Sequence, residues 1–156
     1  MASIRTSIQE ILSSYVVTNE DITEDIESAK HNIKTTTELK NIYNEFEHDK
    51  DEMTLDQIFD EVERKILFNK YTDERIYYSK LILQLFIAVS KKNIAMLKPF
   101  IDKLIKSSYK IMELLQSLLD MDLLDENEYI LECNRLRDDK SGFDDLYKAT
   151  NIIILP

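Results

Sequence analysis

Residues 73–91 read DERIYYSKLILQLFIAVSK. Apolar side chains occupy most of the circumference of a helix drawn through this stretch, and only a narrow polar stripe through Lys80 and Gln84 interrupts them. A helix that is apolar nearly all round is normally buried, with other helices packed around it. We therefore expect a central helix at about 73–91, opened by Thr72 and Asp73. The apolar run from Leu81 to Val89 is much shorter than the ~17 residues that a membrane span needs.

Glycine is nearly missing from the chain. Gly142 is the one glycine in 156 residues, whereas average usage is about 7%. Glycine supplies the positive φ of tight hairpins and the close backbone approach of phosphate-binding loops. Its scarcity excludes a Walker loop, a dinucleotide-binding fingerprint and a meander of β-hairpins. The fold class that remains is all-α.

On the N-terminal side of the central helix, apolar residues at steps of three and four predict three more helices. The first covers about 4–17 and the second reaches about residue 47. Three β-branched residues, Thr35 to Thr37, lower helix propensity and allow a kink or two separate helices there. Thr54 is expected to cap a third helix that reaches Leu67.

On the C-terminal side the same spacing predicts a long helix near 99–121. Pro99 fits the first turn of that helix, or a kink in one that begins at residue 93. Asp125 is expected to cap a further helix that ends near residue 138. Residues 138–142 are expected to form a loop, and a short helix follows at about 144–149.

The chain shows no internal repeat and no low-complexity linker, so we expect a single domain, 1–156, of about six to seven helices. A C-terminal tail, residues 151–156, ends it. Four consecutive aliphatic side chains in the tail are penalised by water, and β-branched residues favour an extended conformation. We expect the tail to dock on the domain's own helices or in a groove of another chain. Its candidate partner-binding residues are Ile152, Ile153, Ile154 and Leu155.

Charge and cysteine usage indicate the compartment. The net charge is −10 and the pI is about 4.7, which opposes non-specific binding to nucleic acid or anionic membrane. The single cysteine, Cys133, can form neither an internal disulfide nor a thiolate zinc site. Residues 1–5 lack the apolar run of a signal peptide. We expect a cytoplasmic or nuclear protein that is neither secreted nor membrane-spanning.

A cluster of lysines departs from the acidic character of the chain. Phe100 and Tyr109 are interleaved with it, so phosphate contact is one interpretation, but the cluster lacks the arginine that planar bidentate recognition favours. It is otherwise the solvent face of an amphipathic helix, or a docking face for an acidic protein. The acidic segment 45–63 of a second copy is one such partner. The candidate residues are Lys91, Lys92, Lys98, Lys103, Lys106 and Lys110.

No constellation of residues predicts catalysis, a metal site or a cofactor. His31 and His48 lie among charged residues, and Cys133 lies on an apolar helix face. Glu45 and His48 form one Glu-x-x-His spacing, but the di-iron pattern needs two. We therefore expect no catalytic residue, no metal ligand and no cofactor.

The sequence thus favours a non-enzymatic protein–protein interaction module, such as a subunit, adaptor or inhibitor. A protein encoded by a virus or phage is one version of it. Its partner is another protein, or a second copy in a homo-oligomer. One alternative is an enzyme or carrier with a carboxylate or metal site inside the bundle. A second is a nucleic-acid-binding subunit that uses the face from Lys91 to Lys110.

Overall fold

The computed structural model describes residues 19–45, 53–91 and 93–154, with side chains at 19–23, 25, 94 and 149–154 left outside the description. These ranges contain four α-helices and one 3-10 turn, and no strand. The predicted all-α class is confirmed, whereas six to seven helices is more than the described residues contain. The helices are α2 (Asn19–Glu45), α3 (Leu55–Ser90), α4 (Leu97–Asp120) and α5 (Glu126–Ile154), with η2 (Ile94–Met96) between α3 and α4.

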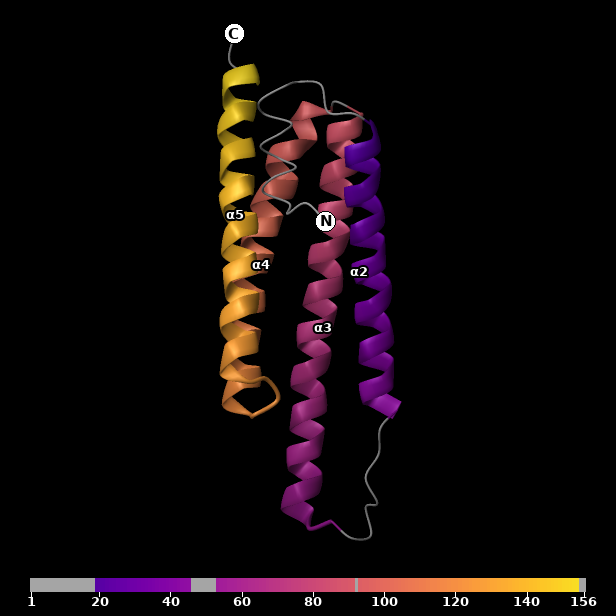
Figure 1. Ribbon diagram of the computed structural model, residues 1–156. Helices are drawn as coiled ribbons and strands as arrows, with labels where there is room; N and C mark the ends of the chain where they lie inside the picture. The colour runs from indigo at the N-terminus through magenta and orange to yellow at the C-terminus, as the bar shows by residue number, and fades with distance from the viewer. Residues whose placement is uncertain (1–18, 46–52, 92, 155–156) are drawn as a thin grey trace.

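The helices run up and down along one axis (Figure 1). Helix α3 packs against α2 on one side and α4 on the other, and α5 packs mainly against α4. Helices α2 and α5 therefore occupy opposite margins of the bundle (Figure 1). The two inner helices, α3 and α4, contribute most of the buried side chains.

The predicted central helix is the C-terminal half of α3. Its buried apolar residues recur at helical spacing, while Lys80 and Gln84 are exposed, as the sequence predicts. Fully burying one large aliphatic or aromatic side chain contributes about 1.5–3 kcal/mol, so this half of α3 anchors the core. The side chains buried there are Tyr78, Leu81, Ile82, Leu85, Phe86 and Ala88.

The separate helices predicted near 54–67 and 73–91 are one helix, α3. Thr72 does not cap a new helix: its hydroxyl donates to the Phe68 carbonyl oxygen at 3.0 Å within the continuing helix, and the side chain is buried. The predicted cap at Thr54 is confirmed. Its Oγ1 accepts from the Gln57 backbone N–H at 3.2 Å, and Gln57 Oε1 accepts from the Thr54 N–H at 2.9 Å.

The loop predicted at 138–142 is also helical, and α5 runs through it. A glycine inside a helix costs about 1 kcal/mol relative to alanine, but Phe143 and Leu146 beyond it are buried in the core. That burial outweighs the cost of Gly142. The predicted cap at Asp125 is confirmed, because its Oδ1 accepts from the Glu128 N–H at 2.8 Å.

Helix α5 continues to Ile154, so the extended conformation predicted for the C-terminal tail is wrong for residues 151–154. Leu155 and Pro156 lie outside the described residues, as does the predicted helix at 4–17. Helix α2 is unbroken at Thr35 to Thr37. The hydroxyls of Thr35 and Thr37 donate to backbone carbonyl oxygens four residues earlier, which satisfies them inside the helix.

The turn between α4 and α5 is made without glycine. Asp122 takes a left-handed backbone conformation, φ 57°. The Asp122 N–H donates to the Leu119 carbonyl oxygen and the Leu123 N–H donates to that of Leu118, the paired bonds of a Schellman motif. Among the described residues, no helix is both long and apolar enough to cross a membrane.

Candidate interaction surfaces

The structure does not bring all the lysines of the cluster together on one surface. Lys103, Lys106 and Lys110 are exposed together on α4, and Lys91 is exposed after the end of α3. Lys98 is half-buried, with its ammonium 5.2 Å from the centre of the Tyr147 ring. Lys92 lies outside the described residues.

Part of the positive charge on α4 is already paired. The Lys110 ammonium lies 3.5 Å from Glu74 Oε2, and Glu74 Oε1 accepts from the Ser107 hydroxyl at 2.8 Å. The exposed lysines therefore make a short row of three rather than a patch of six. Of the aliphatic tail, Ile152, Ile153 and Ile154 have a helical backbone, but their side chains and all of Leu155 lie outside the description.

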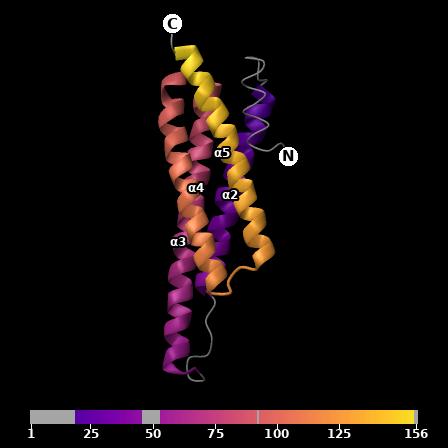
Figure 2. The same cartoon turned by 90° about the vertical axis from the view of Figure 1, so that its left-hand side faces the viewer.

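The N-terminal part of α3 projects from the bundle. The Tyr43 and Phe68 rings lie 4.3 Å apart, and the Asn44 and Asn69 side-chain amides bond to each other, so the described end of α2 is level with these residues of α3. Figures 1 and 2 show that α3 also extends beyond the ends of α4 and α5. We call residues 55–66 the α3 tip.

Four large apolar side chains on the α3 tip are exposed. Leu55, Phe59, Val62 and Ile66 expose 67, 58, 48 and 50% of their surface. Their steps of four, three and four residues place them along one side of the helix, as in the seam of a coiled coil. Isolated exposed apolar residues are common on proteins, whereas an aligned group makes the surface a candidate interaction site. These four residues are the apolar stripe.

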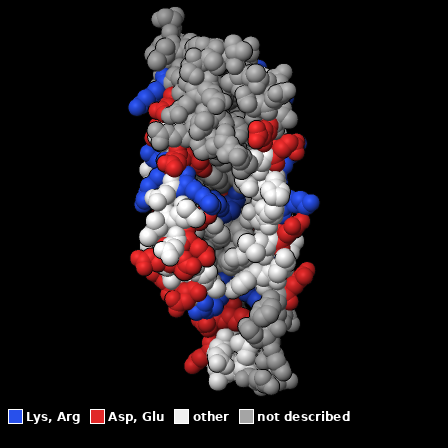
Figure 3. Space-filling model, viewed as in Figure 1, with Lys and Arg blue, Asp and Glu red and all other residues white. Residues whose placement is uncertain are grey.

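Acidic residues border the apolar stripe. Two of them are neutralised within the helix, because Asp60 pairs with Arg64 at 2.8 Å and Glu61 with Lys65 at 3.6 Å. In the part of the chain that the structure describes, Asp56 and Glu63 make no ion pair. Figure 3 shows uncharged surface at the end of the molecule that the α3 tip forms, with acidic side chains beside it.

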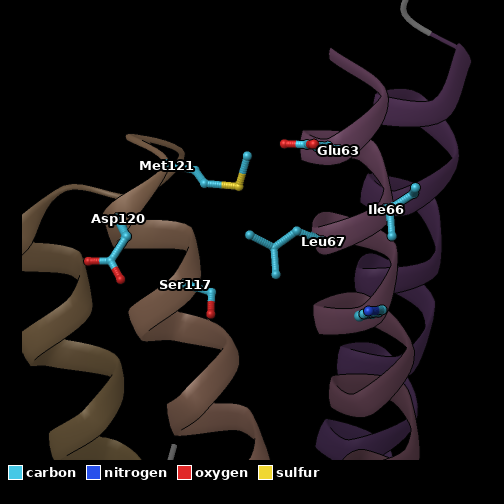
Figure 4. A pocket seen from close by; sticks show the side chains of 7 residues that line it. Glu63, Ile66, Leu67, Ser117, Asp120 and Met121 are labelled. Atoms are coloured by element: carbon cyan, nitrogen blue, oxygen red, sulfur yellow. The ribbon is translucent and has the colours of Figure 1, made fainter. Parts of the chain in front are cut away.

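A cavity of about 370 Å³, widely open to solvent, lies at the base of the α3 tip, between α3 and the end of α4. Ile66 belongs to both the apolar stripe and this cavity. Figure 4 shows Leu67 and Met121 pointing toward each other across it, with the Glu63 carboxylate directed toward the same space. The lining residues are Glu63, Ile66, Leu67, Lys70, Ser117, Asp120 and Met121.

Sequence reasoning placed Leu55, Phe59, Val62 and Ile66 on a third helix but missed that they form a surface. Their spacing is equally compatible with a core-facing helix. The missing information was the length of α3, which carries these residues past the ends of its neighbours. The steps of four, three and four residues, which are typical of a coiled-coil seam, were the signal in the sequence that could have identified this surface.

A second group of polar residues connects α3 to α5. The Arg75 guanidinium pairs with Glu132 at 2.9 Å, and the Tyr78 hydroxyl donates to Asp139 Oδ2 at 2.9 Å. Burial raises the pKa of Asp139 to about 6, against the smaller lowering effects of the Tyr78 hydrogen bond and Arg75. Burial likewise raises the pKa of Tyr78 well above its usual 10, and the Asp139 charge adds to that shift. The group ties α3 directly to α5, which otherwise packs mainly on α4.

The residues considered for catalysis or metal binding are dispersed. Cys133 is buried in the core and His31 is exposed on α2. His48 lies outside the described residues. Within the described ranges, no three His, Cys, Asp or Glu side chains are grouped so as to hold a metal ion.

No protein-family model, no curated protein and no solved structure matches this chain.

Proposed function

We propose that the protein is a non-enzymatic interaction module that binds another protein through the α3 tip. The observation that carries the proposal is the apolar stripe, four large side chains about half exposed on a helix end that projects past its neighbours. Removing apolar surface from water is favourable by about 25 cal/mol per Å². A partner that covers the stripe would gain this energy without rearranging the core.

The rest of the molecule is compatible with this role. The core of α3, α4 and α5 provides a rigid base, and a rigid helix face loses little conformational entropy on binding. The single buried cysteine suits a reducing compartment, so we place the interaction in the cytoplasm or nucleus. The C-terminal residues Ile152 to Leu155 remain a second candidate contact.

The test compares three forms of the protein, each isolated gently from its own cells and analysed by native mass spectrometry. They are the wild type, the double variant Phe59→Ser/Val62→Ser and the control Ile130→Ser/Leu131→Ser. Ile130 and Leu131 are 49 and 51% exposed on α5, so the control removes similar apolar surface elsewhere.

We expect a stoichiometric partner, or a second copy, that the wild type and the control retain and the α3-tip variant loses. The same bound species in all three forms would refute the role of the α3 tip. A bare wild-type protein would refute the proposal itself.

A second candidate function is nucleic-acid binding by the lysine row of α4. The observation in its favour is that Lys103, Lys106 and Lys110 are exposed together. Its test is binding to a labelled oligonucleotide at two salt concentrations, because phosphate contacts weaken steeply with salt. Salt-sensitive binding that is lost when the three lysines become glutamate would favour this candidate over the interaction module.

A further inference from the structure

We propose that the α3 tip binds a basic amphipathic helix of a different protein, an inference that rests on the proposed function and specifies the partner's chemistry. The partner helix lies along the apolar stripe, inserts one apolar side chain into the cavity at the base of the tip, and places Lys or Arg beside Asp56 and Glu63.

The stripe fits a helix rather than an extended strand. Leu55 and Ile66 are eleven residues apart, which is about 16 Å along a helix at 1.5 Å per residue. The 4-3-4 spacing of the stripe presents the holes into which another helix inserts its own side chains. An extended peptide gains most of its affinity from backbone bonds to a free sheet edge, and the described residues contain no strand.

The cavity supplies an anchor point at one end of the stripe. Ile66 is one of its lining residues, and Leu67 and Met121 face each other across it in Figure 4. Its volume of about 370 Å³ has room for one large apolar side chain. Helix-in-groove complexes are commonly fixed by such anchors from one face of the bound helix.

The charged residues beside the apolar stripe specify the charge of the partner. Asp56 and Glu63 each follow a residue of the apolar stripe by one position, so they flank the seam where a coiled-coil partner places its own charged residues. Glu63 also lines the cavity, together with Asp120 and Lys70. Acidic flanks attract a basic partner and repel an acidic one, and they also accelerate association.

The same charges argue against a second copy. Two α3 tips packed antiparallel would place their flanking carboxylates against one another, which costs energy. The lysine row of α4 has the right charge to pair with the acidic flanks. Within the described helix α4, however, Tyr109 is the one large apolar side chain that is exposed. The row offers no apolar face to cover the stripe. Neither the α3 tip nor the lysine row of a second copy matches the stripe in both charge and apolar surface, which favours a different chain as the partner.

The experiment uses two fluorescent peptides of about 15 residues, long enough to form a helix. Both have leucines at 4-3-4 spacing; one has lysine flanks and the other glutamate flanks. Fluorescence anisotropy measures their binding to the full chain. We expect the lysine peptide to bind at least about tenfold more tightly, with a preference that decreases as salt rises.

Three variants locate the site. Phe59→Ser/Val62→Ser should weaken the lysine peptide about tenfold or more, and Glu63→Lys should reduce the preference for lysine over glutamate flanks. The control Glu24→Lys makes the same charge change on an exposed residue near the start of α2, at the opposite end of the bundle (Figure 1). It should leave the preference unchanged. Unaltered melting temperatures establish that the variants fold.

Equal binding of the two peptides would overturn the inference, as would an equal effect of Glu63→Lys and Glu24→Lys. Self-association of the wild type that Phe59→Ser/Val62→Ser abolishes would overturn it in favour of a second copy. These outcomes are separate from the proposed function. A cellular partner that depends on the α3 tip, combined with no charge preference between peptides, refutes the partner's chemistry but not the interaction role.

Discussion

The Tyr78 hydroxyl donates a hydrogen bond to Asp139 Oδ2 at 2.9 Å and joins the middle of α3 to α5. Tyr78 is buried, with 3% of its surface exposed, so this bond lies in a poorly solvated environment. Loss of hydration disfavours the ionised carboxylate and is the largest cause of its raised pKa, about 6. Arg75 and the Tyr78 hydroxyl offset part of it, and Asp138 and Glu132 add to it. Asp139 therefore makes stability depend on pH near neutrality.

The substitution Asp139→Asn should remove this dependence. The folded-state pKa of Asp139 lies above its usual 3.8, so the folded protein binds the proton more tightly than the unfolded chain. The contribution of the protonated group is complete below about pH 4 and is lost as pH rises through 6. From pH 4 to 7, the variant's free energy of unfolding should gain about 2–3 kcal/mol relative to wild type.

Urea unfolding of both proteins at several pH values between 4 and 7.5 measures this difference. Asp102→Asn is the control, because Asp102 is exposed on α4 and is not among the charges that shift the pKa of Asp139. Parallel pH profiles for wild type and Asp139→Asn would contradict the prediction.

The substitution Tyr78→Phe removes the hydroxyl group that donates a hydrogen bond to the Asp139 carboxylate. Because the hydrogen bond favours the ionised form, its loss should raise the pKa of Asp139 further. At pH 7 the variant should lose about 1–3 kcal/mol of stability, the cost of leaving a buried acceptor unsatisfied. In the double variant Tyr78→Phe/Asp139→Asn the two effects should not add. A strictly additive double-mutant cycle at pH 7 would show that the two side chains are not coupled.

The sequence predicted the composition of the core better than the ends of the helices. Apolar periodicity located the buried half of α3 and the long helix α4, because burial follows directly from that pattern. It failed at Thr72 and at Gly142, where local signals resemble a cap and a loop. Tertiary packing overrode both, since residues on each side are buried in one core or packed against it. The turn at Asp122 shows the reverse case: a left-handed position with no glycine to indicate it.

The candidate site was less accessible to sequence reasoning. The lysines of α4 are conspicuous in the sequence, yet Lys98 lies over Tyr147 and Lys110 pairs with Glu74. The apolar stripe looks like an ordinary core-facing pattern, because exposure depends on where neighbouring helices end. Relative helix lengths arise from tertiary packing, which local periodicity does not encode.

The apolar stripe and the core should respond differently to truncation. Phe59 is 58% exposed and Phe86 is 1% exposed. Phe59→Ala should change stability by no more than about 0.5 kcal/mol, as for surface substitutions generally. Phe86→Ala removes a buried ring from the core and should cost about 3–5 kcal/mol. Thermal and urea unfolding distinguish them, and a large loss of stability in Phe59→Ala would mean that the ring is buried in solution.

The capping box at Thr54 should control order in the α3 tip. Thr54 and Gln57 satisfy each other's backbone N–H groups, and replacing such a cap with alanine costs about 1 kcal/mol. The projecting tip lies outside the core, so Thr54→Ala should increase local opening with little change in melting temperature. Hydrogen exchange of backbone amides in the α3 tip should become about fivefold faster, while amides around Phe86 stay unchanged. Thr54→Ser retains the hydroxyl and should exchange like wild type; equal acceleration in the serine and alanine variants would show that the cap does not hold the tip.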